Sequence, residues 1–288
     1  MADGPGRLAD AFAAARGAAF IPYVMGGYPD PATSAERAVQ VAAFADVLEI
    51  GVPFSDPLAD GPTIQAAGQA ALDAGTTPDT VLEIAAQAAR VGPPIVLMTY
   101  VNIVLCAGPR AFCERAAKAG VSGLIIPDLP IDEGDEVRTQ ARRAGLAVVP
   151  LAAPTTTNQR LAQIGRVGEG FLYCVSATGV TGGSVEVGEE LRDFLARARQ
   201  HVALPLAVGF GVRTPGDAAK ISEVARRAGV APTAVRWYEQ VGVLPAPERG
   251  DNGYREYGEV DLTRLRLVVT LRRLGLGPED AGRLARLC

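Results

Sequence analysis

Short apolar runs alternate with longer amphipathic stretches along the chain up to about residue 215. The runs are apolar on both faces, which is typical of strands in a parallel sheet that helices cover on each side. Their fairly even spacing favours a (β/α)8 barrel over a doubly wound sheet, and no GxGxxG motif follows the first run. The predicted strands are Phe20–Met25, Val47–Gly51, Ile95–Tyr100, Gly123–Pro127, Ala147–Pro150, Phe171–Val175 and Leu206–Val208, and the predicted helices are Ala32–Phe44, Pro78–Arg90, Pro109–Ala119, Glu133–Ala144 and Glu189–Gln200.

The periodic pattern changes after residue 215, where an eighth strand is expected and does not appear. Two short helices separated by a Gly-containing turn are predicted at Ile221–Ala228 and Pro232–Val241, which is helix-turn-helix spacing. A hairpin rich in Pro and Gly follows, and two more helices are predicted at Glu259–Leu274 and Pro278–Leu287. The change of period indicates a second domain of a different kind.

We therefore predict an α/β protein in two parts. Residues 1–219 form a TIM (β/α)8-type barrel lacking its eighth strand, and residues 220–288 form a small, mostly-α winged helix-turn-helix module. Charge follows this division, because residues 1–221 carry a net charge of −6 whereas residues 222–288 carry +2. Two different kinds of surface are the expected result.

Composition predicts a soluble protein, with 48% hydrophobic and 21% charged residues. No apolar segment approaches the length of about 18 residues needed to span a membrane, and the N-terminus has no signal-peptide core. We therefore expect a cytoplasmic protein with no membrane association. The four cysteines form no CxxC pair and there is one histidine, so neither a zinc site nor a disulfide framework is expected. Cys174 is predicted to be a core residue.

The stretch LEIGVPFSDPLADGPTIQ, from Leu48 to Gln65, places an acid inside an apolar run. A buried charge is costly unless it is paired or used, and residues at the carboxyl ends of barrel strands face the active site. Glu49 and Asp60 would then take separate acid and base roles. In the alternative interpretation, backbone donors satisfy Glu49 while Asp60 helps to cap the helix that begins near Pro62. Spacing alone leaves both interpretations open.

Two glycine-rich turns follow the late strands of the predicted barrel. SATGVTGGS spans Ser176 to Ser184, and Gly209-Phe210-Gly211 follows the seventh strand. Phosphate sites in such barrels are commonly built from backbone N–H groups in the loops after late strands, where glycine lets the backbone come close. The two turns together indicate a phosphorylated small-molecule substrate.

Six segments in this order resemble the tryptophan synthase alpha chain family: FIPYVMGGYPD, LEIGVPFSDPLADGPTIQ, LMTYVNIV, GLIIPDLP, YCVSATGVTG and VGFGV. The resemblance covers roughly residues 1–220. It implies cleavage of indole-3-glycerol phosphate to indole and glyceraldehyde 3-phosphate, a retro-aldol reaction in tryptophan biosynthesis that needs no metal or cofactor.

The same resemblance implies a role for each matching residue. Glu49 would protonate the indole ring carbon, and Asp60 would hold the indole N–H and stabilise the charge that develops there. The substrate-binding residues would be Tyr23, Tyr100, Tyr173, Thr181, Gly182, Phe210 and Gly211. Tyr173 and Thr181 would support the two acids, while Gly182 and Gly211 would donate backbone N–H groups to the phosphate. The family often has Phe where Tyr23 stands.

The resemblance also implies a protein partner. The loop from Pro53 to Asp60 and the segment Asp128-Leu129-Pro130 would lie toward the tryptophan synthase beta chain, which carries pyridoxal phosphate and receives indole in an alpha2-beta2 type complex. The family continues with an eighth strand and a Gly-Ser turn that complete the phosphate site, and neither is present here.

From Lys220 onward the chain resembles the DNA-binding domain of MerR-type regulators, through ISEVARRAGVAPTAVRWYEQVGVLPAPERGDNGYREY. This resemblance makes Pro232–Val241 the recognition helix. The implied DNA-binding residues are Arg236 and Tyr238 on that helix and Tyr254 and Arg255 on the wing. Such regulators dimerise through a long helix after this domain, and that helix has no counterpart in the sequence given.

Three interpretations of the whole chain remain open. The first is an alpha-chain lyase with an appended DNA-binding module. The second is a MerR-like transcriptional regulator with an inactive barrel, and the third is a non-functional fusion product. Because no Gly/Ser/Pro linker separates Thr214–Lys220 from Ile221–Ala228, our hypothesis for the origin of the junction is a recombined or misassembled reading frame. Finding one intact fused frame and one full-length product would reject that hypothesis.

Overall fold

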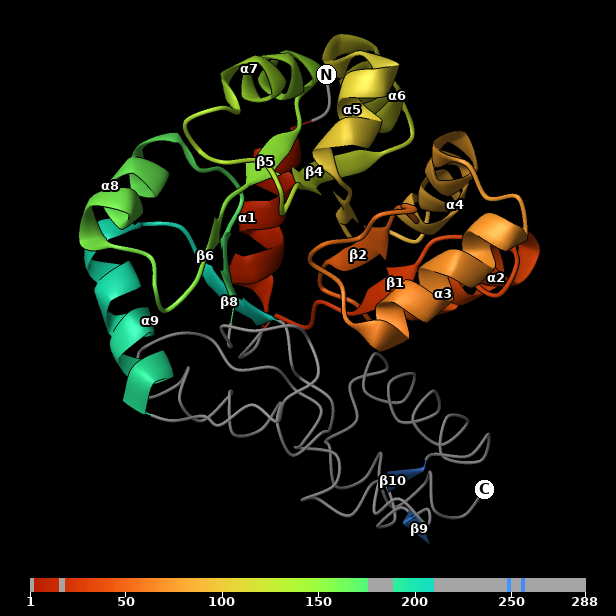
Figure 1. The fold of residues 1–288 in the computed structure, drawn as a ribbon, viewed down its shortest axis with the longest axis horizontal. Coiled ribbons are helices and arrows are strands. Elements are labelled where there is room, and N and C mark those ends of the chain that lie inside the picture. Colours follow the sequence, from red (N-terminus) through yellow and green to blue (C-terminus); the bar gives the residue numbers. More distant parts are fainter. Residues whose placement is uncertain (1–2, 16–18, 176–188, 210–247, 250–254, 257–288) are drawn as a thin grey trace.

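Parallel strands form the wall of the protein's first domain (Figure 1). The computed structural model describes residues 3–15, 19–175 and 189–209, together with two short strands at 248–249 and 255–256. One sheet has the order β1-β2-β3-β4-β5, and a second has the order β6-β7-β8. The strands are β1 (Tyr23–Met25), β2 (Leu48–Gly51), β3 (Ile95–Met98), β4 (Val121–Ile125), β5 (Ala147–Val149), β6 (Leu151–Ala152), β7 (Leu172–Val175) and β8 (Leu206–Gly209).

The two sheets are consecutive sections of one curved wall, because only Pro150 separates β5 from β6. Proline has no N–H to donate, so it breaks the hydrogen-bond ladder at this point. All neighbouring strands of both sheets pair in parallel. Within the described residues the wall has seven strand positions, with β5 and β6 sharing one between β4 and β7. This confirms the predicted α/β barrel.

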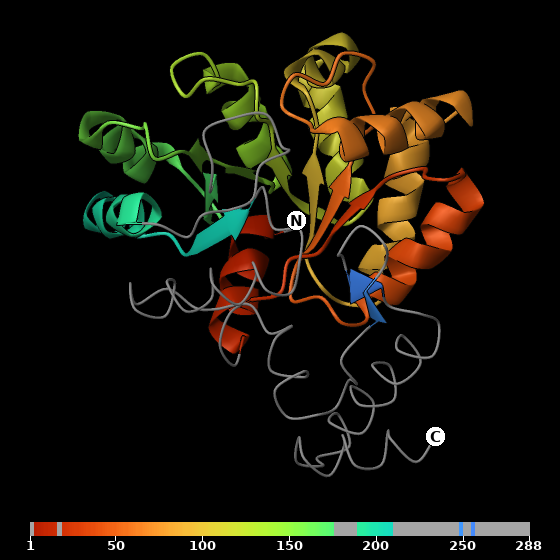
Figure 2. The same cartoon turned by 60° about the horizontal axis from the view of Figure 1, so that its bottom comes forward.

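Helices surround the wall and connect successive strands, as a parallel sheet requires (Figure 2). Pairs of neighbouring helices pack together on the outside, namely α2 with α4, α6 with α7 and α8 with α9. The helices are α1 (Gly4–Ala14), α2 (Pro31–Ala42), α3 (Pro62–Asp73), α4 (Pro78–Ala89), α5 (Val101–Ala107), α6 (Pro109–Lys118), α7 (Asp135–Ala144), α8 (Asn158–Val167) and α9 (Glu189–His201).

Local sequence explains where several of these helices begin. The Asp30 side chain accepts a hydrogen bond from the Thr33 N–H at the start of α2, and Thr77 and Thr80 form a capping box at the start of α4. The helix ranges predicted from the sequence did not include α1, α3, α5 or α8, and several predicted strands were too long. The strand predicted from Phe20 begins only at Tyr23, since Pro22 cannot donate to the ladder.

Side chains alternate between the inside and the outside of the wall, as strand geometry requires. On β2, Leu48 and Ile50 pack against the helices, whereas Val47 belongs to the interior cluster. The same alternation directs Glu49 and Gly51 inward. Leu8 of α1 lies in the interior cluster, and α1 closes the end of the barrel opposite the strand arrowheads (Figure 2).

Beyond residue 209 the structure describes one hairpin, in which β9 (Glu248–Arg249) pairs antiparallel with β10 (Arg255–Glu256). It confirms the hairpin predicted after the helix-turn-helix. The four helices predicted between residues 221 and 287 lie outside the described residues. In the part of the chain that the structure describes, no helix is long and apolar enough to cross a membrane. Cys174 is a core residue as predicted, and burial raises the pKa of its thiol to about 12.

Candidate active site

Glu49 lies in the barrel interior between two neighbouring strands. It stands in register with Tyr23 on β1 and with Val96 on β3, so all three side chains share the inner face. Glu49 lies two residues before the carboxyl end of β2, on the side of the barrel where proteins of this type assemble their active sites. Glu49 is 3% exposed, which makes it the only acid among the described residues that is fully buried.

The Glu49 carboxyl group is incompletely satisfied in this position. Its Oε1 atom has no hydrogen-bond partner among the residues described. Burial, helped by the nearby charge of Asp60, raises the pKa of Glu49 from 4.5 to about 8. Glu49 therefore holds a proton near neutral pH, which a general acid needs. Backbone donors do not account for this residue, so the alternative structural interpretation fails for Oε1.

Asp60 lies in the loop between β2 and α3 and is half-buried. The N-cap of α3 is Gly61, and no side chain caps that helix, so the interpretation of Asp60 as a helix cap is wrong. Burial raises the pKa of Asp60, while a hydrogen bond from the Tyr100 side chain lowers it. Asp60 and Glu49 thus form two coupled carboxyl groups in different environments, the arrangement that separates acid and base roles.

Tyr100 holds the loop that carries Asp60. Its hydroxyl oxygen accepts a hydrogen bond of 3.0 Å from the Ala59 N–H, and its ring stacks on Phe54 with centroids 5.1 Å apart. Burial raises the pKa of Tyr100 to about 12. The hydroxyl therefore stays protonated and can donate to Asp60. Phe54 is a site residue that the sequence analysis missed, although it lies inside the conspicuous PFSDPLADGPTIQ segment.

Two tyrosines of the interior lie over glycines of the next strand. A Cβ atom on Gly51 would be 2.0 Å from the Tyr23 hydroxyl oxygen, and one on Gly209 would be 2.1 Å from that of Tyr173. Tyr173 pairs in register with Ala207, two residues before Gly209, just as Tyr23 pairs with Glu49, two residues before Gly51. Glycine at the end of each strand therefore leaves room for the tyrosine ring.

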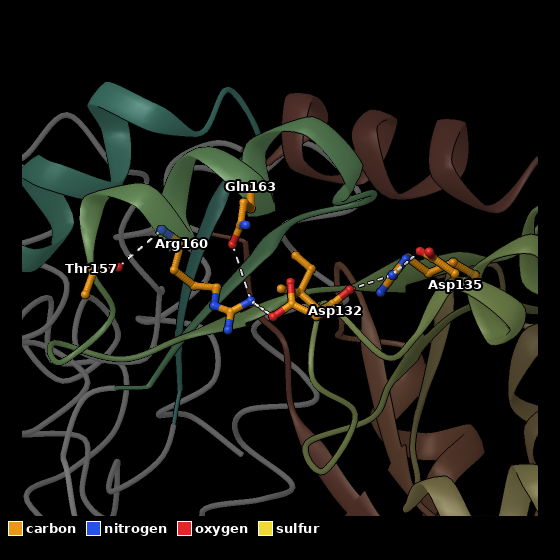
Figure 3. A network of polar contacts seen from close by, with 7 residues as sticks. Asp132, Asp135, Thr157, Arg160 and Gln163 are labelled. Atoms are coloured by element: carbon orange, nitrogen blue, oxygen red, sulfur yellow. Dashed lines mark hydrogen bonds and ion pairs between the residues drawn. The ribbon is translucent and has the colours of Figure 1, made fainter.

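Ion pairs and hydrogen bonds fix the loop that follows β4 (Figure 3). The Asp128 carboxylate accepts a 2.9 Å hydrogen bond from the Val101 N–H at the start of α5. Arg138 is buried and donates to the Ile131 carbonyl at 2.6 Å, while Arg160 pairs with Asp132 and bonds to Gln163. The sequence predicted only that Asp128 belongs to a segment facing the partner. The structure adds that its carboxylate also binds the start of α5.

The structure brings together Glu49, Asp60, Tyr23 and Tyr100, and it places Tyr173 in the same interior cluster. The other predicted substrate-binding residues, Thr181, Gly182, Phe210 and Gly211, lie outside the described residues. So do Arg236, Tyr238 and Tyr254 of the predicted DNA-binding set. Arg255 belongs to β10, and only the position of its backbone is described.

Exchanging Glu49 for Gln is expected to flatten the dependence of stability on pH. Between pH 4.5 and about 8 the folded state keeps the Glu49 proton that the unfolded chain loses, so stability falls as pH rises through this window. Each unit of pKa difference is worth about 1.4 kcal/mol, and Gln removes this contribution. Denaturant unfolding of both proteins between pH 5 and 9 measures it. Parallel curves would contradict the assigned pKa.

Exchanging Gly51 for Ala is expected to destabilise the barrel by about 1–3 kcal/mol, because the new Cβ atom overlaps the Tyr23 ring and forces it to move. Gly68→Ala is the matched control. Its Cβ atom would lie 3.5 Å from Met25 Cε, an ordinary contact, and alanine favours the helix. Urea unfolding of the two variants should separate them. Equal stability would show that Tyr23 does not need the glycine.

The parallel barrel, with the buried carboxyl group of Glu49 on β2 and the coupled one of Asp60 in the loop after this strand, defines the class of (β/α)-barrel proteins. The particular family follows from comparison with known proteins. The family model of the tryptophan synthase alpha chain matches residues 9–242, and the chain belongs to this family.

Curated relatives and solved structures agree with this assignment. The tryptophan synthase alpha chain of Gloeobacter violaceus is 46% identical over 225 residues, which cover 76% of this chain and 82% of the relative. That of Geobacillus stearothermophilus is 40% identical over 242 residues, covering 83% and 90%. A chain from the tryptophan synthase a2b2 complex of Pyrococcus furiosus has a TM-score of 0.67 at 36% identity, covering 74% and 85%. A Mycobacterium tuberculosis tryptophan synthase chain has a TM-score of 0.70 at 36% identity, covering 78% and 86%.

The C-terminal part matches a second family model, MerR HTH family regulatory protein, over residues 219–287. The two matches overlap between residues 219 and 242. The barrel family match therefore extends past the boundary at 219/220 that the sequence predicts. The predicted two-family composition of the chain is confirmed by these matches.

Proposed function

We propose that this chain cleaves indole-3-glycerol phosphate to indole and glyceraldehyde 3-phosphate. The observation that carries the proposal is the pair of buried Glu49 and half-buried Asp60, in which Glu49 has a pKa of about 8 and Asp60 lies close enough to contribute to this value. Family membership supports the choice of substrate. Glu49 and Asp60 are the catalytic residues of the proposed reaction.

In the first step Glu49 transfers its proton to the indole ring carbon that carries the glycerol phosphate chain. That carbon becomes tetrahedral, and positive charge develops on the ring nitrogen. Asp60 accepts a hydrogen bond from the ring N–H and stabilises this charge. Tyr100 keeps Asp60 in place by bonding both to its side chain and to the neighbouring Ala59 N–H.

In the second step the Glu49 carboxylate takes the proton of the hydroxyl group next to the breaking bond. The C–O bond becomes a carbonyl, the C–C bond breaks, and its electron pair returns to the ring and neutralises the nitrogen. Indole and the aldehyde product form together, and Glu49 is protonated again. One carboxyl group thus acts first as acid and then as base.

The remaining substrate contacts are proposed from the family motifs. Tyr23, Tyr100 and Phe210 would line the indole pocket, and Tyr173 and Thr181 would support the acids. Gly182 and Gly211 would give backbone N–H groups to the phosphate. The a2b2 complex named for the Pyrococcus furiosus relative supports a tryptophan synthase beta chain as partner. The exposed side chain of Leu58, 86% exposed in the loop that carries Asp60, belongs to the surface proposed to face that partner.

The direct test is indole release from indole-3-glycerol phosphate by the full chain, with and without a beta chain. Release that depends on Glu49 supports the proposal. Absence of Glu49-dependent indole under both conditions rejects it, and leaves the regulator with an inactive barrel or the non-functional fusion.

For residues 220–288 we propose a DNA-binding role. The MerR-type match over residues 219–287 and the β9–β10 hairpin at the position of the wing support it. Arg236 and Tyr238 would contact DNA from the recognition helix, and Tyr254 and Arg255 from the wing.

A gel-shift assay with palindromic promoter DNA, repeated across salt concentrations, tests this role. Phosphate contacts by arginine predict binding that weakens steeply as salt rises, and Arg236→Ala should weaken it further. Binding that is equal for the full chain and for a chain ending at residue 219 would reject the role. The same truncation tests the proposed boundary at 219/220, which requires the shorter chain to fold.

A further inference from the structure

The Tyr23 hydroxyl group occupies an unusual place for a polar atom. Tyr23 shares the inner face of the barrel with Glu49, and its ring extends along the wall over Gly51, two residues beyond Glu49 on the same face. The hydroxyl therefore lies on the side of Glu49 that faces the strand's carboxyl end. Its hydrogen bond is to Met25 Sδ at 3.8 Å, and a thioether is a weak acceptor.

Glu49, in turn, lacks a hydrogen-bond donor to one of its carboxyl oxygens. Its Oε1 atom has no hydrogen-bond partner among the described residues. A protonated carboxyl group tolerates this position, but a buried carboxylate without a donor is strongly disfavoured. The proposed reaction nevertheless requires Glu49 to become a carboxylate after it has protonated the ring carbon. Besides the substrate hydroxyl, a donor from the barrel interior would stabilise this carboxylate.

Besides Tyr173 of the same interior cluster, which the family motifs propose as a support for the acids, the groups around this pair leave few candidates for that donor. The neighbour of Glu49 on β3 is the apolar Val96, and the charged neighbour from the following loop is Asp60, an acceptor. Tyr100 is engaged with Ala59 and Asp60. On the β1 side stands Tyr23, whose pKa burial raises well above its usual value, helped by Asp60, Glu49 and Tyr100. Tyr23 therefore keeps its proton and acts as a donor.

We propose that Tyr23 is a positioning residue for Glu49. The Tyr23 hydroxyl turns from Met25 Sδ to Glu49 Oε1 when Glu49 becomes a carboxylate. The part of this proposal that concerns catalysis rests on the proposed lyase function. The Tyr23 proton stays on the phenol oxygen throughout. The proton that moves passes from Glu49 to the ring carbon, and a second proton returns to Glu49 from the substrate hydroxyl, so the exchange balances without Tyr23.

The hydrogen bond is tested by the titration of Glu49 in Tyr23→Phe, which removes one oxygen and keeps the ring. Infrared spectroscopy of the full chain follows the carboxyl band that is absent in Glu49→Gln. Loss of a donor to the carboxylate should raise the pKa of Glu49 by about one unit or more. Tyr28→Phe is the matched control, because Tyr28 follows β1 and is 42% exposed, and it should leave the band unchanged.

Met25→Leu provides a second variant that acts in the opposite direction. It removes the competing sulfur acceptor and keeps the apolar volume, so the Tyr23 hydroxyl is released toward Glu49. The pKa of Glu49 should stay the same or fall. A rise in Met25→Leu, or an unchanged pKa in Tyr23→Phe, overturns the proposal.

Kinetics add a readout that a purely structural role would not move. In Tyr23→Phe, kcat for indole release should fall about 10-fold with little change in KM, and the alkaline limb of the pH profile should move upward. A parent chain that releases no indole would refute the lyase function. The infrared titration alone would then test whether Tyr23 donates a hydrogen bond to Glu49. A parent that releases indole while Tyr23→Phe keeps its kcat and its pH profile would refute the role of Tyr23 alone.

Discussion

Glu49→Gln is expected to lower kcat for indole release by at least about 100-fold, the usual contribution of a positioned general acid and base. Glutamine keeps the size of the side chain but can neither give a proton to the ring carbon nor take one from the substrate hydroxyl. The loss should fall on kcat, because the amide still fills the same interior position between Tyr23 and Val96. Single-turnover indole release, measured with saturating substrate, separates this loss from weaker binding.

The control for this variant is its folding. Glu49 lies in a packed interior, so far-ultraviolet circular dichroism and urea unfolding at pH 4 should match the parent, because below pH 4.5 residue 49 is mostly neutral in the folded and the unfolded state of both proteins. A Glu49→Gln protein that folds and still releases indole at the parent's rate would remove Glu49 from the chemistry. The two interpretations with an inactive barrel predict that neither protein releases indole.

The sequence was sufficient for the type of fold and for the location of Glu49, because both depend on local periodicity. Val47, Glu49 and Gly51 alternate with Leu48 and Ile50, and a two-residue period fixes which of them point inward. A parallel sheet follows from apolar runs separated by amphipathic helices. Strand ends were less predictable. Pro22 and Pro150 interrupt the ladder through missing N–H groups, an effect that apolar content does not reveal.

Contacts between segments that are distant in sequence could not be predicted from local periodicity. The stacking of Phe54 on Tyr100 and the hydrogen bond from the Val101 N–H to Asp128 join loops that are far apart in sequence. The helix-cap interpretation of Asp60 was plausible from its distance to Pro62. It failed because Gly61 occupies the cap and Tyr100 binds the carboxyl group instead.

The space that Gly51 leaves for Tyr23 also had no signal in the sequence, since a terminal glycine in a strand has several common explanations. Only the structure shows that the ring of Tyr23 extends over Gly51. The resemblance to the family placed Tyr23 in the indole pocket. The hydrogen bond that we propose from Tyr23 to Glu49 would explain the hydroxyl group that distinguishes this residue from phenylalanine.

Asp60→Asn is expected to lower kcat/KM for indole release by about 100-fold. The amide keeps the shape of the carboxylate but removes the negative charge that would stabilise the positive ring nitrogen, and charge stabilisation of this kind is usually worth a factor of about 100–1000. The exchange of Asp60 for Asn also changes the pKa of the neighbouring acid, Glu49. Because the charge of Asp60 contributes to the raised pKa of Glu49, its removal should lower the pKa of Glu49 and move the alkaline limb of the pH profile downward.

Tyr100→Phe supplies the comparison for this variant. It removes the hydrogen bond that lowers the pKa of Asp60, so Asp60 should become harder to ionise and the acidic limb of kcat/KM should move upward. The two variants thus displace opposite limbs of one pH profile in opposite directions. A general loosening of the loop between β2 and α3 would lower activity in both without this pattern. If the alkaline limb stays in place in Asp60→Asn, the electrostatic coupling between Glu49 and Asp60 plays no part in the reaction, and Asp60 acts through contact with the substrate alone.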